Sequence, residues 1–328
     1  MPPALLELPV PRDFILARDA CSYGYFLLEP NLWDPATRSL RRTLSLPAGA
    51  ATFIIDQPPA KPARGGLRAS RGRPLIARAD RSLSTADRAA ASAQIARMLR
   101  LDEDHAHVRE FHCLDPRWKA SGRARLFRSP SLFEDVIKTV TSCNVTWPGT
   151  VGMNRRLCAV YGEPSPSGHR AFPTPRVLAR LRPASLRSRC KVGYRDARIV
   201  ALARLFARNA PAVADLESPA LADDRLLERL LELPGVGPYA AHNILQLLGR
   251  YAHLPLDTES VRHGRTILGF KGPSRAIMRR VERHFAPFGP HRFRAYWFEM
   301  WAFYEAKRGP SHTWERERVG SSFTASQF

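Results

Sequence analysis

A glycine-containing turn and an aspartate that follows it are the residues of this chain whose types and spacing best suit chemistry. The aspartate is Asp257, and the turn with its flanks comprises Leu233, Pro234, Gly235, Val236, Gly237, Pro238 and Tyr239. Glycine permits positive φ and lets another backbone approach closely, so Gly235 and Gly237 favour a tight hairpin. The N–H groups of both glycines and of the next helix would point outward. The pattern therefore predicts an anion site that a DNA phosphate would fit.

Two helices must hold this hairpin in place. Before it, residues 224–233 carry apolar side chains on one helical face, at Leu226, Leu227, Leu230 and Leu231. After it, Pro238 suits the first turn of a second helix, because its missing N–H costs nothing there. Apolar residues then recur at helical spacing, at Ala241, Ile244, Leu245 and Leu248. The sequence predicts a helix, a hairpin and a second helix.

Asp257 also has a purely structural interpretation. The segment 256–261, Leu-Asp-Thr-Glu-Ser-Val, begins a helix well, with the Asp257 carboxylate as its N-cap. Taken alone, the residues favour this cap. A capping role and a catalytic role are compatible in one carboxylate.

The segment Leu-Pro-Gly-Val-Gly followed by Leu256-Asp257-Thr258 resembles the helix-hairpin-helix (HhH-GPD) DNA glycosylases, the superfamily of endonuclease III, the adenine glycosylase and 8-oxoguanine glycosylase. In that family the aspartate after the hairpin is catalytic, and the resemblance places this role on Asp257. The resemblance implies base excision repair: a damaged base is flipped out of double-stranded DNA and its N-glycosidic bond is hydrolysed. A buried carboxylate would stabilise the oxocarbenium-like sugar.

The middle of the chain resembles the 8-oxoguanine and 3-methyladenine glycosylase branch. The matching segments are Leu132-Phe-Glu, Ser142-Cys-Asn144, Gly152-Met153, Arg156-Leu-Cys158 and Val192-Gly193-Tyr194-Arg195. The branch has an asparagine at the Asn144 position that enters the duplex and pairs with the orphaned base, which an amide can do as donor and acceptor. A turn asparagine is the structural alternative. Where the branch has further asparagines and an arginine, this chain has Val145, Thr146 and Gly149.

A last helix is expected over residues 291–307. Trp297, Met300, Trp301 and Tyr304 form one apolar face, for which core packing is the default interpretation. In the branch this helix also lines the base pocket, and the resemblance places two pocket positions on Glu299 and Phe303. Phe303 would stack on a flipped base and Glu299 would accept a hydrogen bond from its edge. An oxidised purine and an alkylated, cationic purine both stay open as the damaged base.

Tyr239 bears on the type of reaction. In the bifunctional relatives a lysine stands at this place and attacks the sugar as an amine, after which the strand is nicked. Tyrosine has no amine, so the expectation is a monofunctional glycosylase that uses water. Two alternatives remain, a non-catalytic DNA-binding protein with the same hairpin and a bifunctional glycosylase and lyase.

Composition agrees with a DNA partner. The 328 residues carry a formal net charge of +21 at pH 7, which points to a polyanion, although an arginine-rich proteome would give the same excess. No apolar run is long enough to span a bilayer, and the start lacks a signal pattern. We expect a monomeric, cytoplasmic protein associated with the nucleoid.

Cysteine usage and the resemblance address cofactors. The five cysteines are widely spread, as in reduced thiols, and none follows Cys190. The iron–sulfur cluster that some relatives hold on four cysteines after the catalytic helix is therefore expected to be absent, and no other metal is predicted. A monovalent cation at the hairpin carbonyls is implied by the resemblance alone.

The expected fold class is α+β, mainly α. Residues 1–83 are predicted to form a small antiparallel β domain, with strands at 14–16, 23–28, 41–46, 51–55 and 75–77. It contains a basic Pro/Gly-rich hairpin loop at 57–74. Residues 84–307 are expected to form a two-lobed helical glycosylase domain, with capping boxes at Ser84 and Ser131. Residues 308–328 are expected to form a loose polar tail.

Overall fold

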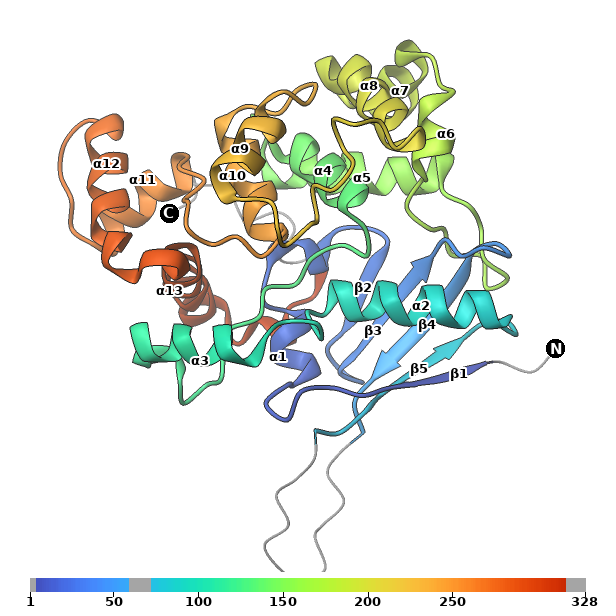
Figure 1. The fold of residues 1–328 in the computed structure, drawn as a ribbon, viewed down its shortest axis with the longest axis horizontal. Helices are drawn as coiled ribbons and strands as arrows, with labels where there is room; N and C mark the ends of the chain where they lie inside the picture. Colours follow the sequence, from blue (N-terminus) through green and yellow to red (C-terminus); the bar gives the residue numbers. More distant parts are fainter. Residues whose placement is uncertain (1–3, 59–71, 317–328) are drawn as a thin grey trace, which may run out of the picture.

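The computed structural model describes residues 4–58 and 72–316, which are mainly helical and contain one five-stranded sheet (Figure 1). All strand pairs are antiparallel, and the strand order is β1-β5-β4-β3-β2. The strands are β1 (Leu5–Leu8), β2 (Asn31–Asp34), β3 (Ser39–Leu44), β4 (Ala51–Asp56) and β5 (Leu75–Ala79). The predicted fold class, α+β and mainly α, is confirmed.

Buried and exposed side chains alternate along strand β4 of the sheet. On β4, Phe53 and Ile55 are fully buried, whereas Ile54 between them is exposed. Successive side chains of a strand point to opposite faces, so one face of the sheet packs inward. The predicted hairpin between β4 and β5 is present as an antiparallel pair. Residues 59–71, most of its basic loop, lie outside the described residues.

Two predicted strands are wrong. Residues 14–16 lead into the short helix α1 (Leu16–Ala20), and residues 23–28 contain the 3-10 turn η1 (Gly24–Leu27). Tyr23, Tyr25, Phe26, Leu27 and Leu28 are all buried. When nearly every residue of a short segment is apolar, the segment has no periodicity that would distinguish a strand from a buried turn.

Most of the other regular elements of the described chain are helices. They are α2 (Thr85–Met98), α3 (His105–Leu114), α4 (Leu132–Ser142), α5 (Trp147–Tyr161), α6 (Pro175–Ala179), α7 (Pro183–Cys190), α8 (Asp196–Ala207), α9 (Asp223–Leu231), α10 (Pro238–Leu247), α11 (Thr258–Thr266), α12 (Ser274–Phe285) and α13 (Arg292–Arg308). Ser84 forms the expected capping box with Asp87. Ser131 caps α4 through the N–H of Glu134, whose own side chain is engaged elsewhere. No helix among these is both long and apolar enough to cross a bilayer.

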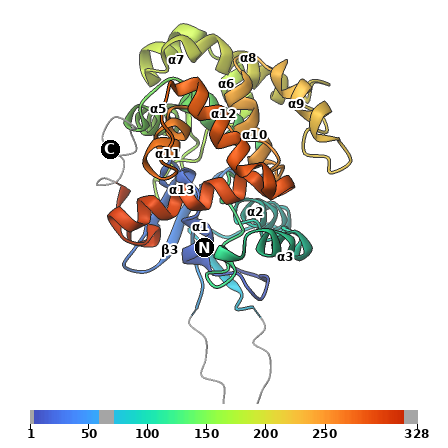
Figure 2. The same ribbon diagram turned by 90° about the vertical axis from the view of Figure 1, so that its left-hand side faces the viewer.

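Two hydrophobic cores divide the molecule. The first joins the sheet with α2, α3 and the C-terminal helices α11 to α13, and the second is built by α4 to α10. Figures 1 and 2 show α2 lying across the sheet and α13 running beneath α11 and α12. The division predicted between residues 83 and 84 does not separate the two cores. The sheet shares the first core with α2 and α3, which follow it in sequence, and with the C-terminal helices α11 to α13.

A buried ion cluster links the sheet to the second core. Arg42 on β3 donates to Glu134 on α4, with Nη2 2.6 Å from Oε2, and Lys138 Nζ lies 2.7 Å from the other carboxylate oxygen. All three side chains are nearly inaccessible. Arg42 and Lys138 lower the pKa of Glu134 to about 2 against the opposing effect of burial. The carboxylate therefore stays ionised and fixes α4 against the sheet.

The start of the predicted tail is packed rather than loose. Trp314 is 2% exposed, and its ring centroid lies 5.1 Å from that of Trp301 on α13. A large apolar ring of this kind buries enough area to hold an otherwise polar segment. Residues 317–328 lie outside the described residues.

Candidate functional site

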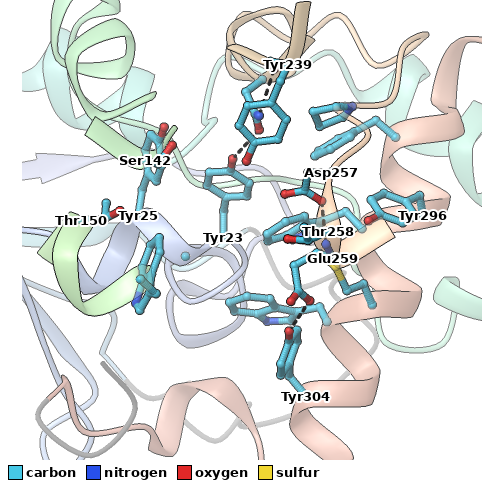
Figure 3. A pocket seen from close by; sticks show the side chains of 18 of the residues that line it. Tyr23, Tyr25, Ser142, Thr150, Tyr239, Asp257, Thr258, Glu259, Tyr296 and Tyr304 are labelled. Carbon is cyan, nitrogen blue, oxygen red and sulfur yellow. Dashed lines mark hydrogen bonds between the residues drawn. The ribbon is translucent and has the colours of Figure 1, made fainter. Parts of the chain in front are cut away.

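A cavity of about 440 Å³ opens between the two cores. Figure 3 shows side chains converging on it from η1, α5, α10, the start of α11 and α13. Nine of its twenty described lining residues are aromatic: Tyr23, Tyr25, Trp147, Tyr239, Phe293, Tyr296, Trp297, Trp301 and Tyr304. Among the described lining residues the charged side chains are Asp257 and Glu259, and none is Lys, Arg or His. The cavity is therefore an apolar, π-rich space with two acidic groups in its wall.

The predicted hairpin joins α9 to α10, as expected. Gly235 has φ +80°, and a Cβ there would lie 2.7 Å from Cδ of Arg198, so this position requires glycine. Gly237 is extended, with φ −99°, and nothing crowds it. Only the first glycine therefore uses positive φ. Both glycines are exposed, and Pro238 begins α10 as predicted.

Asp257 is the N-cap of α11 and lines the cavity. Its Oδ1 accepts the backbone N–H of Glu259 at 2.9 Å and of Ser260 at 3.2 Å, and the Ser260 hydroxyl accepts the N–H of Asp257 at 3.2 Å. The predicted cap is confirmed. Burial raises the pKa of Asp257 to about 6, although the two backbone N–H groups and Tyr239 lower it. The capping hydrogen bonds fix Oδ1 of Asp257, while burial makes its ionised carboxylate less favourable than it would be in water.

Tyr239 lies in the cavity wall, as the second residue of α10. Behind it, the Asn243 side chain donates to the Tyr239 carbonyl at 3.1 Å and accepts from the Tyr23 hydroxyl at 3.3 Å. These bonds connect α10 with η1 across the cavity. Tyr239 and Asp257, which the sequence placed in one site, are brought together (Figure 3).

Asn144 is exposed in the turn between α4 and α5, with φ +50°. Asparagine tolerates this left-handed conformation better than most residues, so the turn interpretation holds. Its neighbours Val145 and Thr146 line the cavity, which places Asn144 at the rim. Arg195 donates to the carbonyls of Cys143 and Asn144 and holds the turn. Insertion into a duplex stays a prediction.

The structure places neither Glu299 nor Phe303 in the cavity. Glu299 accepts from His263 Nε2 at 2.8 Å and pairs with Arg117, so it faces α11 and η2 (Pro116–Trp118). Phe303 lies under the Arg262 guanidinium, 4.5 Å from the ring centroid. The correction follows from helix geometry. The cavity-facing stripe of α13 is 293, 296, 297, 300, 301 and 304. Positions 299 and 303 lie beyond the Tyr296 edge of this stripe, by about 60° and about 20° at 100° per residue.

Sequence reasoning missed several residues of the site. Tyr23 and Tyr25 form one wall, Trp147 another, and Glu259 stands two residues after Asp257. The aromatic run Tyr-Gly-Tyr-Phe at 23–26 was the available signal, but it was interpreted as a strand. The apolar face predicted for the last helix contains the right residues. These residues pack in the first core, and they also line the cavity.

An exposed aromatic residue lies beside the hairpin. Tyr194 is 50% exposed, and its ring lies 4.5 Å from the guanidinium carbon of Arg195 and 5.0 Å from that of Arg198. Arg198 also contacts the hairpin at Gly235. The surface from the Asn144 turn to the hairpin thus carries arginine and aromatic groups. Such groups suit phosphates and unstacked bases.

Metal ligands do not cluster in the described part of the chain. No group of three or more His, Cys, Asp or Glu side chains there could hold an ion. The cysteines are unpaired thiols, and burial raises the pKa of Cys143 to about 11. The hairpin offers peptide carbonyls, the kind of oxygen ligand that a hard cation takes. The monovalent cation there stays a prediction.

Solved structures of DNA glycosylases share this architecture. The 3-methyladenine DNA glycosylase from Archaeoglobus fulgidus superposes with a TM-score of 0.59 at 16% identity, over 93% of this chain and 99% of that chain. The 8-oxoguanine glycosylase/lyase from Clostridium acetobutylicum superposes with a TM-score of 0.60 in its apo form, at 15% identity over 88% and 93%. In complex with DNA that has cytosine opposite 8-oxoguanine, it gives 0.61 at 15% identity over 92% and 98%. No protein-family profile and no curated sequence matches the chain.

Proposed function

We propose that this chain, which has the fold of the helix-hairpin-helix DNA glycosylases, excises a damaged base from double-stranded DNA. The observation that carries the proposal is Asp257, a carboxylate held in the wall of an aromatic cavity next to the hairpin. A base flipped out of the duplex would enter the cavity. The exposed N–H groups of the hairpin would hold the adjacent phosphates.

The chemistry assigned to Asp257 follows from its surroundings. Cleavage of the C1′–N bond leaves the electron pair on the base and positive charge on the sugar. A carboxylate in an apolar site stabilises this charge more strongly than it would in water. Because Oδ1 is fixed by the cap, Oδ2 is the oxygen that would face the sugar and the attacking water. The water adds to C1′, and its proton leaves to the departing base or to solvent.

The lining favours an alkylated, positively charged purine over an oxidised one. Aromatic faces attract a cation, and the charged side chains of the described lining are both acidic. A cationic purine is also a good leaving group, because it departs as a neutral base. Asn144 at the rim would enter the space that the flipped base leaves.

A lesion panel tests the proposed function. We expect single-turnover release of 3-methyladenine and 7-methylguanine from methylated duplex DNA, at rates above those for 8-oxoguanine, uracil and hypoxanthine. Released bases are separated and quantified by chromatography. A protein that binds duplex DNA but releases none of these bases would instead be the non-catalytic DNA-binding alternative.

A second expected result is that the strand stays uncut. The described lining contains no lysine and includes Tyr239, which the sequence resemblance aligns with the lysine of the bifunctional relatives. Without an amine no Schiff base forms, so borohydride should trap no covalent protein–DNA species. The measurement is a denaturing gel of wild-type protein with lesion-containing duplex and borohydride, with Tyr239→Lys alongside it. A trapped band from the wild type would point to an amine elsewhere and to the bifunctional alternative.

A further inference from the structure

The helices α6, α7 and α8 carry an unusual concentration of positive charge. Residues 171–214, which contain these helices, include ten Lys and Arg residues and one acidic residue, Asp196. Asp196 is 2% exposed and pairs with Arg187, and no other Lys or Arg of the segment has an ion-pair partner among the described residues. The exposed cations are Arg176, Arg180, Arg182, Arg187, Arg189, Lys191, Arg198, Arg204 and Arg208.

An arginine-rich proteome does not explain this concentration. The segment is less than one seventh of the chain, yet it carries more than two fifths of the net charge. A surface of this kind, with no exposed carboxylate of its own, repels itself unless anions lie against it. We call α6 to α8 with their nine exposed cations the cationic lobe.

The cationic lobe meets the hairpin at the start of α8. The side chain of Arg198 packs where a Cβ on Gly235 would lie, so it borders the hairpin. Arg195 donates to the carbonyl of Asn144 at 3.3 Å, so the same end of α8 also borders the Asn144 turn. From Arg198 the helix continues to Arg208, about 15 Å farther at 1.5 Å per residue. Figure 1 shows α7 and α8 together at the upper end of the molecule, so the positive surface extends well beyond the hairpin.

We propose that the cationic lobe binds the phosphates of the DNA duplex that flanks the damaged base. This inference rests on the proposed function and adds an interaction surface to it. The hairpin would hold the phosphates beside the flipped base, and the lobe would hold those farther along the duplex. Duplex DNA carries one negative charge per about 1.7 Å of its axis, a charge density that an unpaired cationic surface matches. Contacts of this kind position the protein without reading the sequence.

A quadruple variant removes charge from the cationic lobe without breaking an ion pair. It carries Arg176→Gln, Arg180→Gln, Arg182→Gln and Lys191→Gln, all at exposed positions. We expect its affinity for an undamaged duplex of two helical turns to fall at least about tenfold at low salt. The plot of log affinity against log salt should become less steep by roughly two, since each phosphate contact contributes about 0.9 to the slope. Fluorescence anisotropy over a series of salt concentrations measures both quantities.

The matched control removes the same number of charges outside the cationic lobe. It carries Arg12→Gln, Arg38→Gln, Arg109→Gln and Lys119→Gln, which are also exposed. Both variants lower the net charge by the same amount, so a general attraction between a basic protein and DNA would weaken equally in the two. The control should change the affinity by less than about threefold and keep the salt slope of the wild type. Equal losses in the two variants, or no loss in either, would overturn the proposal.

The length of the flanking duplex gives a second measurement. Short duplexes with one abasic-site analogue are extended by half a helical turn, on one side of the analogue or on the other. Wild-type affinity should rise with the extension on one side only, and the lobe variant should lose this gain. A gain that the lobe variant keeps in full would contradict the proposal. A loss confined to single-stranded DNA would place a single strand on the lobe and would also overturn it.

Binding to undamaged duplex requires no excision, so this inference and the proposed function can fail separately. A protein that releases no base, but in which only the lobe variant loses affinity, would retain the lobe as a duplex-binding surface and reject the glycosylase activity. A protein that releases 3-methyladenine, but in which both quadruple variants lose affinity equally, would retain the activity and reject the role of the lobe.

Discussion

Asp257→Asn is expected to lower single-turnover excision by at least about 10³-fold while the fold and DNA binding persist. Asparagine caps a helix about as well as aspartate, so the bonds to Glu259 and Ser260 can be kept. What disappears is the negative charge that would stabilise the sugar cation. The measurement is the release rate of 3-methyladenine, with thermal melting and fluorescence anisotropy on duplex DNA in parallel.

A second N-cap provides the control for this substitution. Asp104 caps α3 through the N–H of Ala106 at 2.8 Å and lies away from the cavity. Asp104→Asn should leave excision unchanged. Near-normal excision by a folded Asp257→Asn protein would mean that the aspartate is only a cap.

The raised pKa of Asp257 predicts how the excision rate depends on pH. Because burial raises the pKa of Asp257 to about 6, the carboxylate is ionised above this pH and protonated below it. The wild-type rate should therefore be flat above pH 7 and fall about tenfold per pH unit well below pH 6. The residual rate of Asp257→Asn should lack this step.

The second large effect is expected at Glu134. Glu134→Gln leaves Arg42 and Lys138 as buried cations without their shared counter-charge. Breaking a buried pair from one side costs about 3–5 kcal/mol of the free energy of unfolding, because the remaining charge stays desolvated. Urea unfolding followed by circular dichroism measures the loss.

Two controls separate burial from charge. Glu228→Gln removes one partner of the exposed pair with Arg225 on α9, and should leave the free energy of unfolding close to that of the wild type, because water screens the pair. The triple variant Arg42→Met, Glu134→Leu, Lys138→Met should recover most of the stability, since an apolar replacement of the cluster leaves no unpaired charge. A Glu134→Gln protein as stable as the wild type would show that the cluster is hydrated or adapts.

Local sequence rules predicted the parts of the site that are themselves local. The hairpin, the cap at Asp257 and the helices on either side depend on residues a few positions apart. A glycine that needs positive φ and an acidic N-cap can be read directly from such a segment. The likeness in architecture to DNA glycosylases agrees with this part of the prediction.

The remaining walls depend on contacts between distant segments. Tyr23 and Tyr25 reach the cavity because η1 packs between α10 and α13, which no local periodicity encodes. On α13, buried aromatic residues occur on several sides, so the sequence does not reveal which side faces the cavity. This is why Glu299 and Phe303 were assigned one residue away from the lining stripe. Glu259 reads in the sequence as part of a helix start, because its place in the cavity wall depends on the packing of α11 against α13.

The arrangement of the two cores sets an order of events during synthesis. The second core is built from a continuous segment, from Leu132 to Leu245, so it can close as soon as that segment has left the ribosome. The first core joins the sheet, α2 and α3 near the start of the chain with α13 and Trp314, so the early part of this core stays incomplete until the C-terminal helices are made. Contacts so far apart in sequence are slow to form and leave the chain prone to aggregation meanwhile. Nascent chains of this protein therefore depend most on chaperones over their N-terminal third, until the last helix completes the core.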